Sequence, residues 1–159
     1  MEGFKIFVYG SLKRGERNFA AYCRGFQAVA AATVVGQLFR QPDGYPMLVV
    51  PAAHVLAVGT NDPAFDVETL AEIEADELQQ EAEGADWEQI TGEIFSFGDP
   101  EVRLPRIDEL EEFVPGGNSL YHRVIVPAMH AVIEPVWTYV APEGRVPPGS
   151  ARMGTSWSS

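Results

Sequence analysis

The chain has 159 residues, of which 46% are hydrophobic and 21% charged, a composition typical of one globular domain with a single core. Its one cysteine excludes an intramolecular disulfide and a multi-cysteine metal site, and no run of about 18 apolar residues is present to form a spanning helix. The net charge of −12 disfavours nucleic acid as a partner, and the acidic start does not resemble a signal peptide, so we expect a cytoplasmic protein that binds neither nucleic acid nor membrane.

Apolar and aromatic runs predict about six strands, at residues 4–9, 28–40 (one strand, or two broken near Gly36), 47–50, 88–97, 120–126 and 131–140. Two short helices are expected, one after Asn18 and one from Asp99-Pro100 to about Phe113, with Asp99 as the cap. A turn near Pro127 is expected to join the last two strands. These elements predict an α+β domain with a mixed sheet or a small barrel rather than a βαβ array.

The acidic residues gather in one segment. Between Asp62 and Glu93 there are 12 acidic and no basic residues, whereas the rest of the chain has 11 of each. We expect a single domain over residues 1–142 with a peripheral acidic helical insertion at about 52–87, docked by a narrow apolar stripe that includes Val67, Leu70 and Ile73. The Gly-, Pro-, Ser- and Arg-rich residues 143–159 are expected to form a mobile tail.

The first candidate site is the segment Val8–Gly15, in which Tyr9-Gly10-Ser11-Leu12 ends a strand. Successive backbone N–H groups in such a turn bind an anion or a carboxylate, and Gly10 allows close approach of the backbone to a ligand. The same residues are compatible with an ordinary strand-to-helix turn. The spacing of the P-loop and of the dinucleotide-binding fingerprint is absent, so nucleotide binding has no support.

The second candidate site is a carboxylate in the helix that follows Asp99. On a helical projection, Glu111 falls inside the edge of the apolar stripe formed by Ile107, Leu110 and Val114. The other carboxylates are expected to face water: Asp108, Glu109 and Glu112. Desolvation raises the pKa of an inward carboxylate, which suits Glu111 to proton transfer near neutral pH. The alternative is a structural ion pair between Glu111 and an arginine.

Other residues of catalytic type give weaker signals. The histidines share no metal-ligand spacing and are expected at the surface: His54, His122 and His130. Ser11 lacks the nucleophile-elbow context, and Cys23 lies on the apolar stripe of its helix. Tyr139 is expected to pack in the core, although strand aromatics also line pockets. These residues therefore give no support for a metal site.

Several short motifs together resemble the γ-glutamylcyclotransferase-like (AIG2-like) family over about residues 4–50 and 88–140. They are Tyr9-Gly10-Ser11-Leu12, the Gly44-Tyr45-Pro46 turn, the Gly92-Glu93-Ile94 strand, the Asp108-Glu109-Leu110-Glu111 element and Tyr121-His122-Arg123. Their order and rough spacing also agree with the family. One departure is Glu112, which replaces the usual glycine after the catalytic glutamate. Another is the length of the acidic segment.

This resemblance implies a small mixed β-barrel with flanking helices. It also implies an enzyme that releases 5-oxoproline from a small γ-glutamyl amide, without metal or cofactor. The family's catalytic carboxylate corresponds to Glu111, acting as general acid and base, and its substrate-binding residues correspond to Tyr9, Gly10, Ser11, Leu12 and Tyr121.

Two other functions remain open at this point. The same fold serves equally well as a catalytically silent small-molecule binding module, because fold does not determine function. A third hypothesis is an interaction protein whose partner docks on the acidic helix. No readable motif identifies the amine that a cyclotransferase would release.

Overall fold

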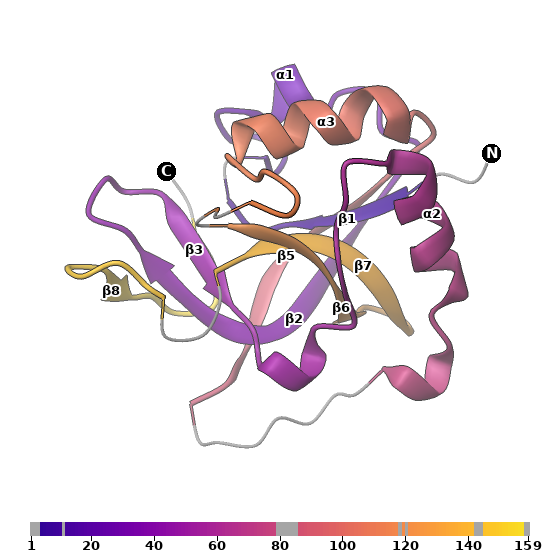
Figure 1. Cartoon of the computed structure of the whole chain (residues 1–159). Helices are drawn as coiled ribbons and strands as arrows, with labels where there is room; N and C mark the ends of the chain where they lie inside the picture. The colour runs from indigo at the N-terminus through magenta and orange to yellow at the C-terminus, as the bar shows by residue number, and fades with distance from the viewer. Residues whose placement is uncertain are drawn as a thin grey trace.

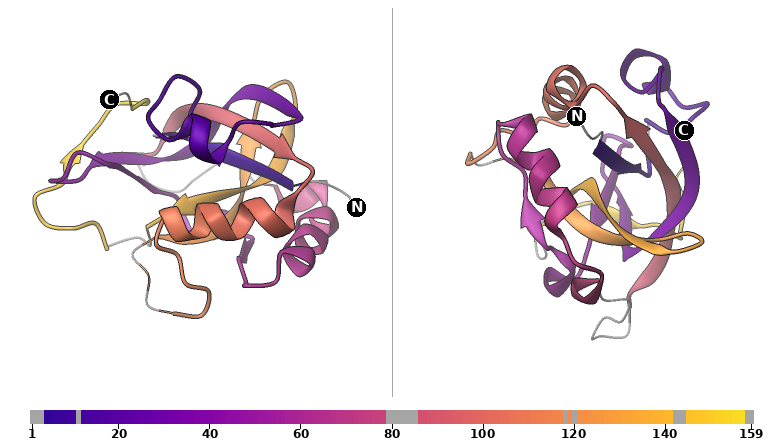
Figure 2. Two further views of the ribbon diagram at one scale, coloured as in Figure 1. Left: turned by 90° about the horizontal axis from the view of Figure 1, so that it is seen from above. Right: turned by 90° about the vertical axis from the view of Figure 1, so that its right-hand side faces the viewer.

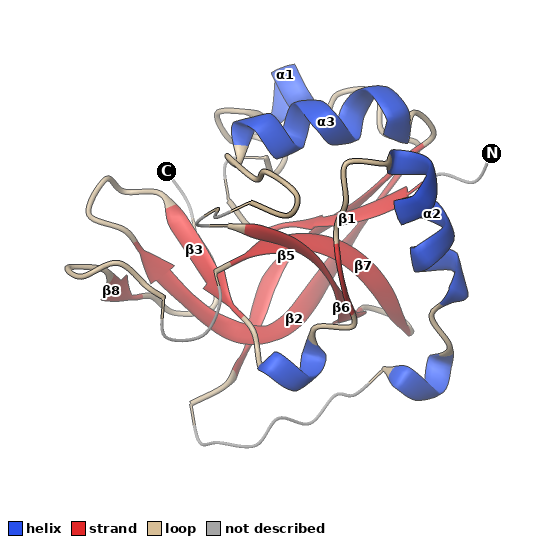
Figure 3. Cartoon of the chain, in the orientation of Figure 1, coloured by secondary structure: helices blue, strands red, loops and turns tan. Residues whose placement is uncertain are grey.

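The computed structural model describes residues 4–10, 12–78, 86–117, 119, 121–141 and 145–157, so the predicted site residue Ser11 lies outside the described residues. The strands are β1 (Phe4–Val8), β2 (Ala28–Arg40), β3 (Pro46–Val49), β4 (Ala57–Val58), β5 (Glu88–Phe97), β6 (His122–Met129), β7 (Ile133–Val140) and β8 (Ala151–Arg152). The helices are α1 (Phe19–Tyr22), α2 (Pro63–Glu72) and α3 (Pro100–Leu110), with 3₁₀ turns η1 (Ala52–His54) and η2 (Ala75–Glu77). Figure 1 shows the chain, and Figure 3 shows that the helices lie outside the strands.

Five strands close into a barrel in the order β2, β5, β1, β7 and β6. The ring closes where β6 returns to β2, through the pairing of Thr33 with Met129. β1 pairs with β7 in parallel, at Ile6 and Trp137, whereas the other pairings around the ring are antiparallel. Figure 2 shows the curved strands with α2 and α3 outside them. The predicted α+β barrel with short flanking helices is confirmed.

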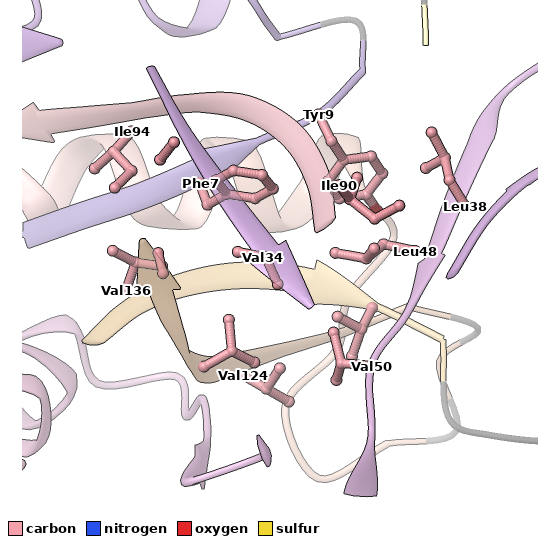
Figure 4. Packing of buried hydrophobic residues seen from close by; sticks show 14 of the residues in the cluster. Phe7, Tyr9, Val34, Leu38, Leu48, Val50, Ile90, Ile94, Val124 and Val136 are labelled. Atoms are coloured by element: carbon pink, nitrogen blue, oxygen red, sulfur yellow. The ribbon is translucent and has the colours of Figure 1, made fainter. Parts of the chain in front are cut away.

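The core has an inner and an outer layer, because successive strand residues point to opposite faces. The inner cluster includes Phe7 of β1 and Tyr9, the residue that follows this strand. They pack with residues of other strands: Val34, Ile90, Val124 and Val136 (Figure 4). The alternate residues Phe4, Ile6 and Val8 belong to the outer cluster, which includes Leu104 and Ile107 of α3. β1 is therefore covered on both faces, which accounts for its nearly continuous apolar sequence.

The strand predictions agree closely with the structure, with one misplaced turn. Pro127 does not end a strand: it lies inside β6, opposite Pro135 of β7. The reversal comes at residues 130–132, where the His130 N–H donates to the Val132 carbonyl at 3.0 Å. The local turn signal was wrong because Pro127 fits an extended backbone and its missing N–H is tolerated within the hairpin.

The acidic segment docks on the barrel as its apolar stripe predicts. Val67 of α2 is buried in the outer cluster, and Leu70 and Ile73 pack against it. Asp62 caps α2 by accepting the N–H groups of Ala64 and Phe65. Asp66, however, is only 1% exposed, so this acidic residue is part of the protein interior rather than of a solvated face.

The described part of the C-terminal segment differs from the predicted mobile tail. β8 pairs with β2, and Trp157 is buried in the inner cluster. A strand pairing and a buried aromatic side chain hold this segment, although its composition is typical of a loop. No helix within the described ranges combines the length and apolarity needed to cross a membrane.

Candidate functional site

A cavity of about 320 Å³ opens where the end of β1, the turn before β3 and the end of α3 meet. The cavity is lined by all five predicted site residues that the structure describes: Tyr9, Gly10, Leu12, Glu111 and Tyr121. Val8 of the first candidate segment also lines it, and residues that the sequence analysis did not assign to the site complete it: Phe7, Asn18, Gln41, Asp43, Tyr45, Pro46, Leu110, Glu112 and Tyr139. The cavity is large enough for a small molecule of amino-acid size.

Glu111 is the C-cap of α3, because the helix ends at Leu110 and not near Phe113 as predicted. The Glu112 N–H donates to the Glu109 carbonyl at 3.1 Å and the Phe113 N–H to the Asp108 carbonyl at 2.9 Å, the two bonds of a Schellman motif. Glu111 is therefore held by backbone hydrogen bonds at the point where the chain leaves the helix, and its side chain lines the cavity.

The Glu111 carboxylate is half-buried and has no hydrogen-bond or ion-pair partner among the described residues. Burial raises its pKa to about 7, and the negative charges of Asp108 and Glu112 contribute to the rise. The alternative hypothesis, a structural ion pair between Glu111 and an arginine, has no support, because the described part of the chain contains no such pair. At neutral pH this group is thus able both to accept and to donate a proton.

Glu112 occupies the position where the family usually has glycine, and its backbone has a φ of +54°. This left-handed conformation is the one that follows a helix in a Schellman motif, and it favours glycine. The turn is therefore formed without glycine, at a backbone cost of about 1 kcal/mol for an L-residue. The exposed carboxylate of Glu112 adds a second negative charge beside Glu111.

Asp108 is buried, which corrects the prediction that it faces water. It accepts from Arg123 Nε at 2.7 Å and Nη2 at 3.0 Å, while Asp66 Oδ2 lies 3.0 Å from Arg123 Nη1. We call Asp66, Asp108 and Arg123 the Arg123 cluster; the arginine side chain is 0% exposed. The helical projection missed it because Asp108 pairs with Arg123 of β6, a contact that the periodicity of α3 by itself does not show.

Three tyrosine hydroxyls of the cavity wall already donate hydrogen bonds within the protein. Tyr9 donates to the Tyr139 carbonyl at 2.6 Å, Tyr139 donates to Asp108 Oδ1 at 2.5 Å, and Tyr121 donates to the Pro46 carbonyl at 2.7 Å. Burial raises the pKa of each, and the charges of Glu111 and of neighbouring groups add to the rise, so all three stay protonated at neutral pH. With each O–H engaged, the oxygen lone pairs of Tyr9 and Tyr139 are acceptors for a ligand.

The cavity wall is also negatively charged. Asp43, Glu111 and Glu112 contribute carboxylates, and none of the described residues that line the cavity is a lysine or an arginine. None of them comes from the acidic segment 52–87 either, as far as the described residues show. In Figure 1, α2 and the turn before β3 lie on opposite sides of the barrel. The charge at the cavity therefore comes from the turn and the end of α3.

Gly10 does not provide room for a ligand in the direction of its missing side chain. A Cβ placed there would lie 2.6 Å from Cγ of Pro46, so the glycine allows contact between the Gly10 loop and the turn before β3. The Gly10 carbonyl accepts from the Lys13 N–H at 3.1 Å and closes a tight turn. Leu12 is buried in the outer cluster as well as lining the cavity.

Other residues of catalytic type play no part in the cavity. Burial raises the pKa of the Cys23 thiol to about 12, and this side chain lies in the outer cluster, as the sequence predicts. His54 is buried and not at the surface. Among the described residues, no group of three or more His, Cys, Asp or Glu side chains is arranged to hold a metal ion.

The family model described as gamma-glutamyl cyclotransferase, AIG2-like, matches residues 6–84. This match includes the Tyr9–Leu12 segment and ends before Glu111, so the assignment of Glu111 depends on its own motif and on the geometry of the cavity. No curated protein sequence matches the chain.

Three solved structures have similar folds. An AIG2-like protein from Mus musculus is 17% identical with a TM-score of 0.56, and the alignment covers 99% of this chain and 90% of that one. YkqA from Bacillus subtilis is 18% identical with a TM-score of 0.55, covering 98% and 39%. Kluyveromyces lactis allophanate hydrolase is 13% identical with a TM-score of 0.56, covering 96% and 20%. The chain thus spans less than half of the last two proteins, and all three likenesses show the fold.

Proposed function

Because the chain belongs to the γ-glutamylcyclotransferase-like (AIG2-like) family, we propose that it is an enzyme that releases 5-oxoproline from a small γ-glutamyl amide. The single observation that carries this proposal is the Glu111 carboxylate, which lines a cavity of about 320 Å³ without a cationic partner among the described residues. Its pKa of about 7 allows both directions of proton transfer at neutral pH.

The reaction is an intramolecular aminolysis. The α-ammonium first releases one proton to solvent, and the neutral α-nitrogen then attacks the γ-carbonyl carbon. The new C–N bond closes a five-membered lactam, and the bond to the leaving nitrogen breaks. Tethering of nucleophile and carbonyl supplies much of the rate through effective molarity. Glu111 takes a proton from the attacking nitrogen and returns it to the leaving nitrogen, so one carboxylate serves as base and then as acid.

The cavity wall supports an ammonium-bearing ligand. The free lone pairs of Tyr9 and Tyr139 and the carboxylates of Asp43 and Glu112 accept hydrogen bonds from an α-ammonium or from a released amine. Because the described part of the wall holds no lysine or arginine, we expect backbone N–H groups to bind the α-carboxylate or the oxyanion. We assign this role to the segment Tyr9–Leu12, as the resemblance implies.

The test is mass-spectrometric detection of 5-oxoproline after incubation of the protein with a panel of γ-glutamyl amines, γ-glutamyl peptides and γ-glutamyl aminoglycosides. We expect 5-oxoproline from at least one of them, in equal amount to the released amine. Absence of product from the whole panel, combined with calorimetric binding of 5-oxoproline, would instead identify a binding module. Absence of both product and binding would reject the cavity as a γ-glutamyl site.

A further inference from the structure

The C-terminal segment passes along the loops that form the cavity. After β8, the Met153 N–H donates to the Leu38 carbonyl at 2.7 Å, which extends the contact with β2. The Thr155 carbonyl then accepts the Thr91 N–H at 2.8 Å and the Thr91 hydroxyl at 3.0 Å. The chain is thus fixed to β2 and to β5 immediately before Trp157.

Trp157 is 2% exposed and belongs to the inner cluster, with Phe7, Tyr9 and Leu48. Its indole Nε1–H donates to the Gly44 carbonyl at 3.2 Å, and its own carbonyl accepts Lys13 Nζ at 2.5 Å. Gly44 belongs to the turn at residues 41–46, which lines the cavity. Lys13 closes the turn that begins at Gly10, which lines the cavity as well. One residue therefore binds both loops.

The two loops also contact each other directly. Gly10 packs against the Pro46 ring, and Arg17 Nη1 donates to the Tyr45 hydroxyl at 2.9 Å with its guanidinium 5.2 Å from the Tyr45 ring centre. Arg17 and Tyr45 are both exposed, so water competes for their contact. The indole of Trp157 is shielded from water, and its hydrogen bond is the better constraint on the separation of the loops.

We propose that Trp157 is a positioning residue for substrate binding, which holds the Gly10 loop and the turn at residues 41–46 at a fixed separation. This inference rests on the proposed function, since it takes the cavity to be the γ-glutamyl site. Glu111 lies at the end of α3, outside both hydrogen bonds of Trp157. Loosening the loops should therefore weaken substrate binding and leave proton transfer by Glu111 intact.

The test is W157F, which keeps an aromatic ring in the inner cluster and removes the N–H donated to Gly44 together with part of the indole volume. We expect KM for a γ-glutamyl substrate to rise about two- to tenfold, the loss of one shielded hydrogen bond, with kcat within about twofold of wild type. K13M removes the other bond of Trp157 and should shift KM in the same direction. K5M is the matched control, because Lys5 pairs with Glu134 away from the cavity.

Hydrogen exchange gives a readout that does not need turnover. In W157F we expect faster amide exchange over residues 10–17 and 41–46 than in wild type or K5M. Unchanged KM together with unchanged exchange, or a fall in kcat at constant KM, would overturn the proposal. Trp157 would then contribute only to the packing of the barrel. If the wild-type protein forms no 5-oxoproline, the proposed function fails, and the exchange of the two loops still decides whether Trp157 positions them.

Discussion

Asp108 and Glu111 lie one helical turn apart at the end of α3, yet their carboxylates have different surroundings. Asp108 belongs to the Arg123 cluster, where a fully buried guanidinium binds it through two hydrogen bonds. Glu111 lines the cavity beside two further carboxylates, with no cation among its described neighbours. Both carboxylates have lost part of their hydration. A positive charge compensates for this loss at Asp108 and not at Glu111.

This difference separates a structural carboxylate from a reactive one. Burial by itself would lower the pKa of Arg123, but the hydrogen bond to Asp108 and the negative charges of Asp108 and Asp66 raise it, so the guanidinium stays charged. In the cavity, burial acts on Glu111 without such compensation and brings its pKa to about 7. The Arg123 cluster therefore stabilises the end of α3, and the Glu111 cavity provides an exchangeable proton.

The largest expected effect is on turnover. Glu111→Gln keeps the size of the side chain and removes the proton acceptor, so we expect kcat to fall by roughly 10²–10⁴-fold while the circular-dichroism spectrum is retained. Glu109→Gln is the matched control, because Glu109 lies in the same turn but is exposed. Equal losses in both variants would show that charge at the helix end matters and Glu111 itself does not.

Removing the cation of the Arg123 cluster should cost stability. Arg123→Met leaves two buried carboxylates without a counter-charge, and we expect the free energy of unfolding to fall by about 3–5 kcal/mol in denaturant titrations. Arg14→Met removes the exposed pair with Glu93 and should cost less than about 1 kcal/mol. If the two variants lose similar amounts of unfolding free energy, the buried Arg123 cluster contributes no more to stability than an exposed ion pair.

The pH dependence of the reaction should report the cavity carboxylate. The base form of Glu111 increases as the pH rises, so kcat/KM should increase with pH and level off above an apparent pKa of about 7. Glu112→Gln removes a neighbouring negative charge and should move this limb to lower pH, by roughly a few tenths of a unit. An unshifted limb in this variant, or a limb near pH 4.5, would contradict the raised pKa.

The same group should affect stability in the opposite sense to an ordinary paired carboxylate. The pKa of Glu111 is raised in the folded state. Its stabilising contribution to the free energy of unfolding is therefore fully present below pH 4.5 and is lost as the pH rises through about 7. We expect the difference in unfolding free energy between wild type and Glu111→Gln to change over this range. Chemical denaturation at several pH values measures it, and a constant difference would refute the assignment.

The smallest expected effect concerns the turn between the two regions. Glu112→Gly relieves a left-handed backbone and should raise the free energy of unfolding by about 0.5–1 kcal/mol. Glu112→Ala is the control, since it removes the same charge without relieving the backbone. A gain of equal size in both variants would point to charge repulsion with Glu111 in place of strain.

Much of this architecture could be predicted from local patterns. The alternation of apolar residues placed the strands of the barrel, and the helical projection selected Glu111 as the inward carboxylate even though α3 ends one residue earlier. The projection failed for Asp108 because its burial depends on Arg123, which is 15 residues away along the chain. The Asp-x-x-Glu and Tyr-x-Arg motifs contained both residues, and only their pairing was missing.

What the sequence by itself determined is periodic and local: the strand alternation, the apolar stripe of α2 and the chemical type of each side chain in the Tyr9–Leu12 and Glu111 motifs. The tertiary structure alone decided which charges meet and which loops face each other. It placed Asp66 of the acidic segment beside Arg123, and it brought Trp157 into the barrel between two loops. These contacts join residues far apart in the chain, and their partners are selected by packing, which leaves no periodic signal in either segment.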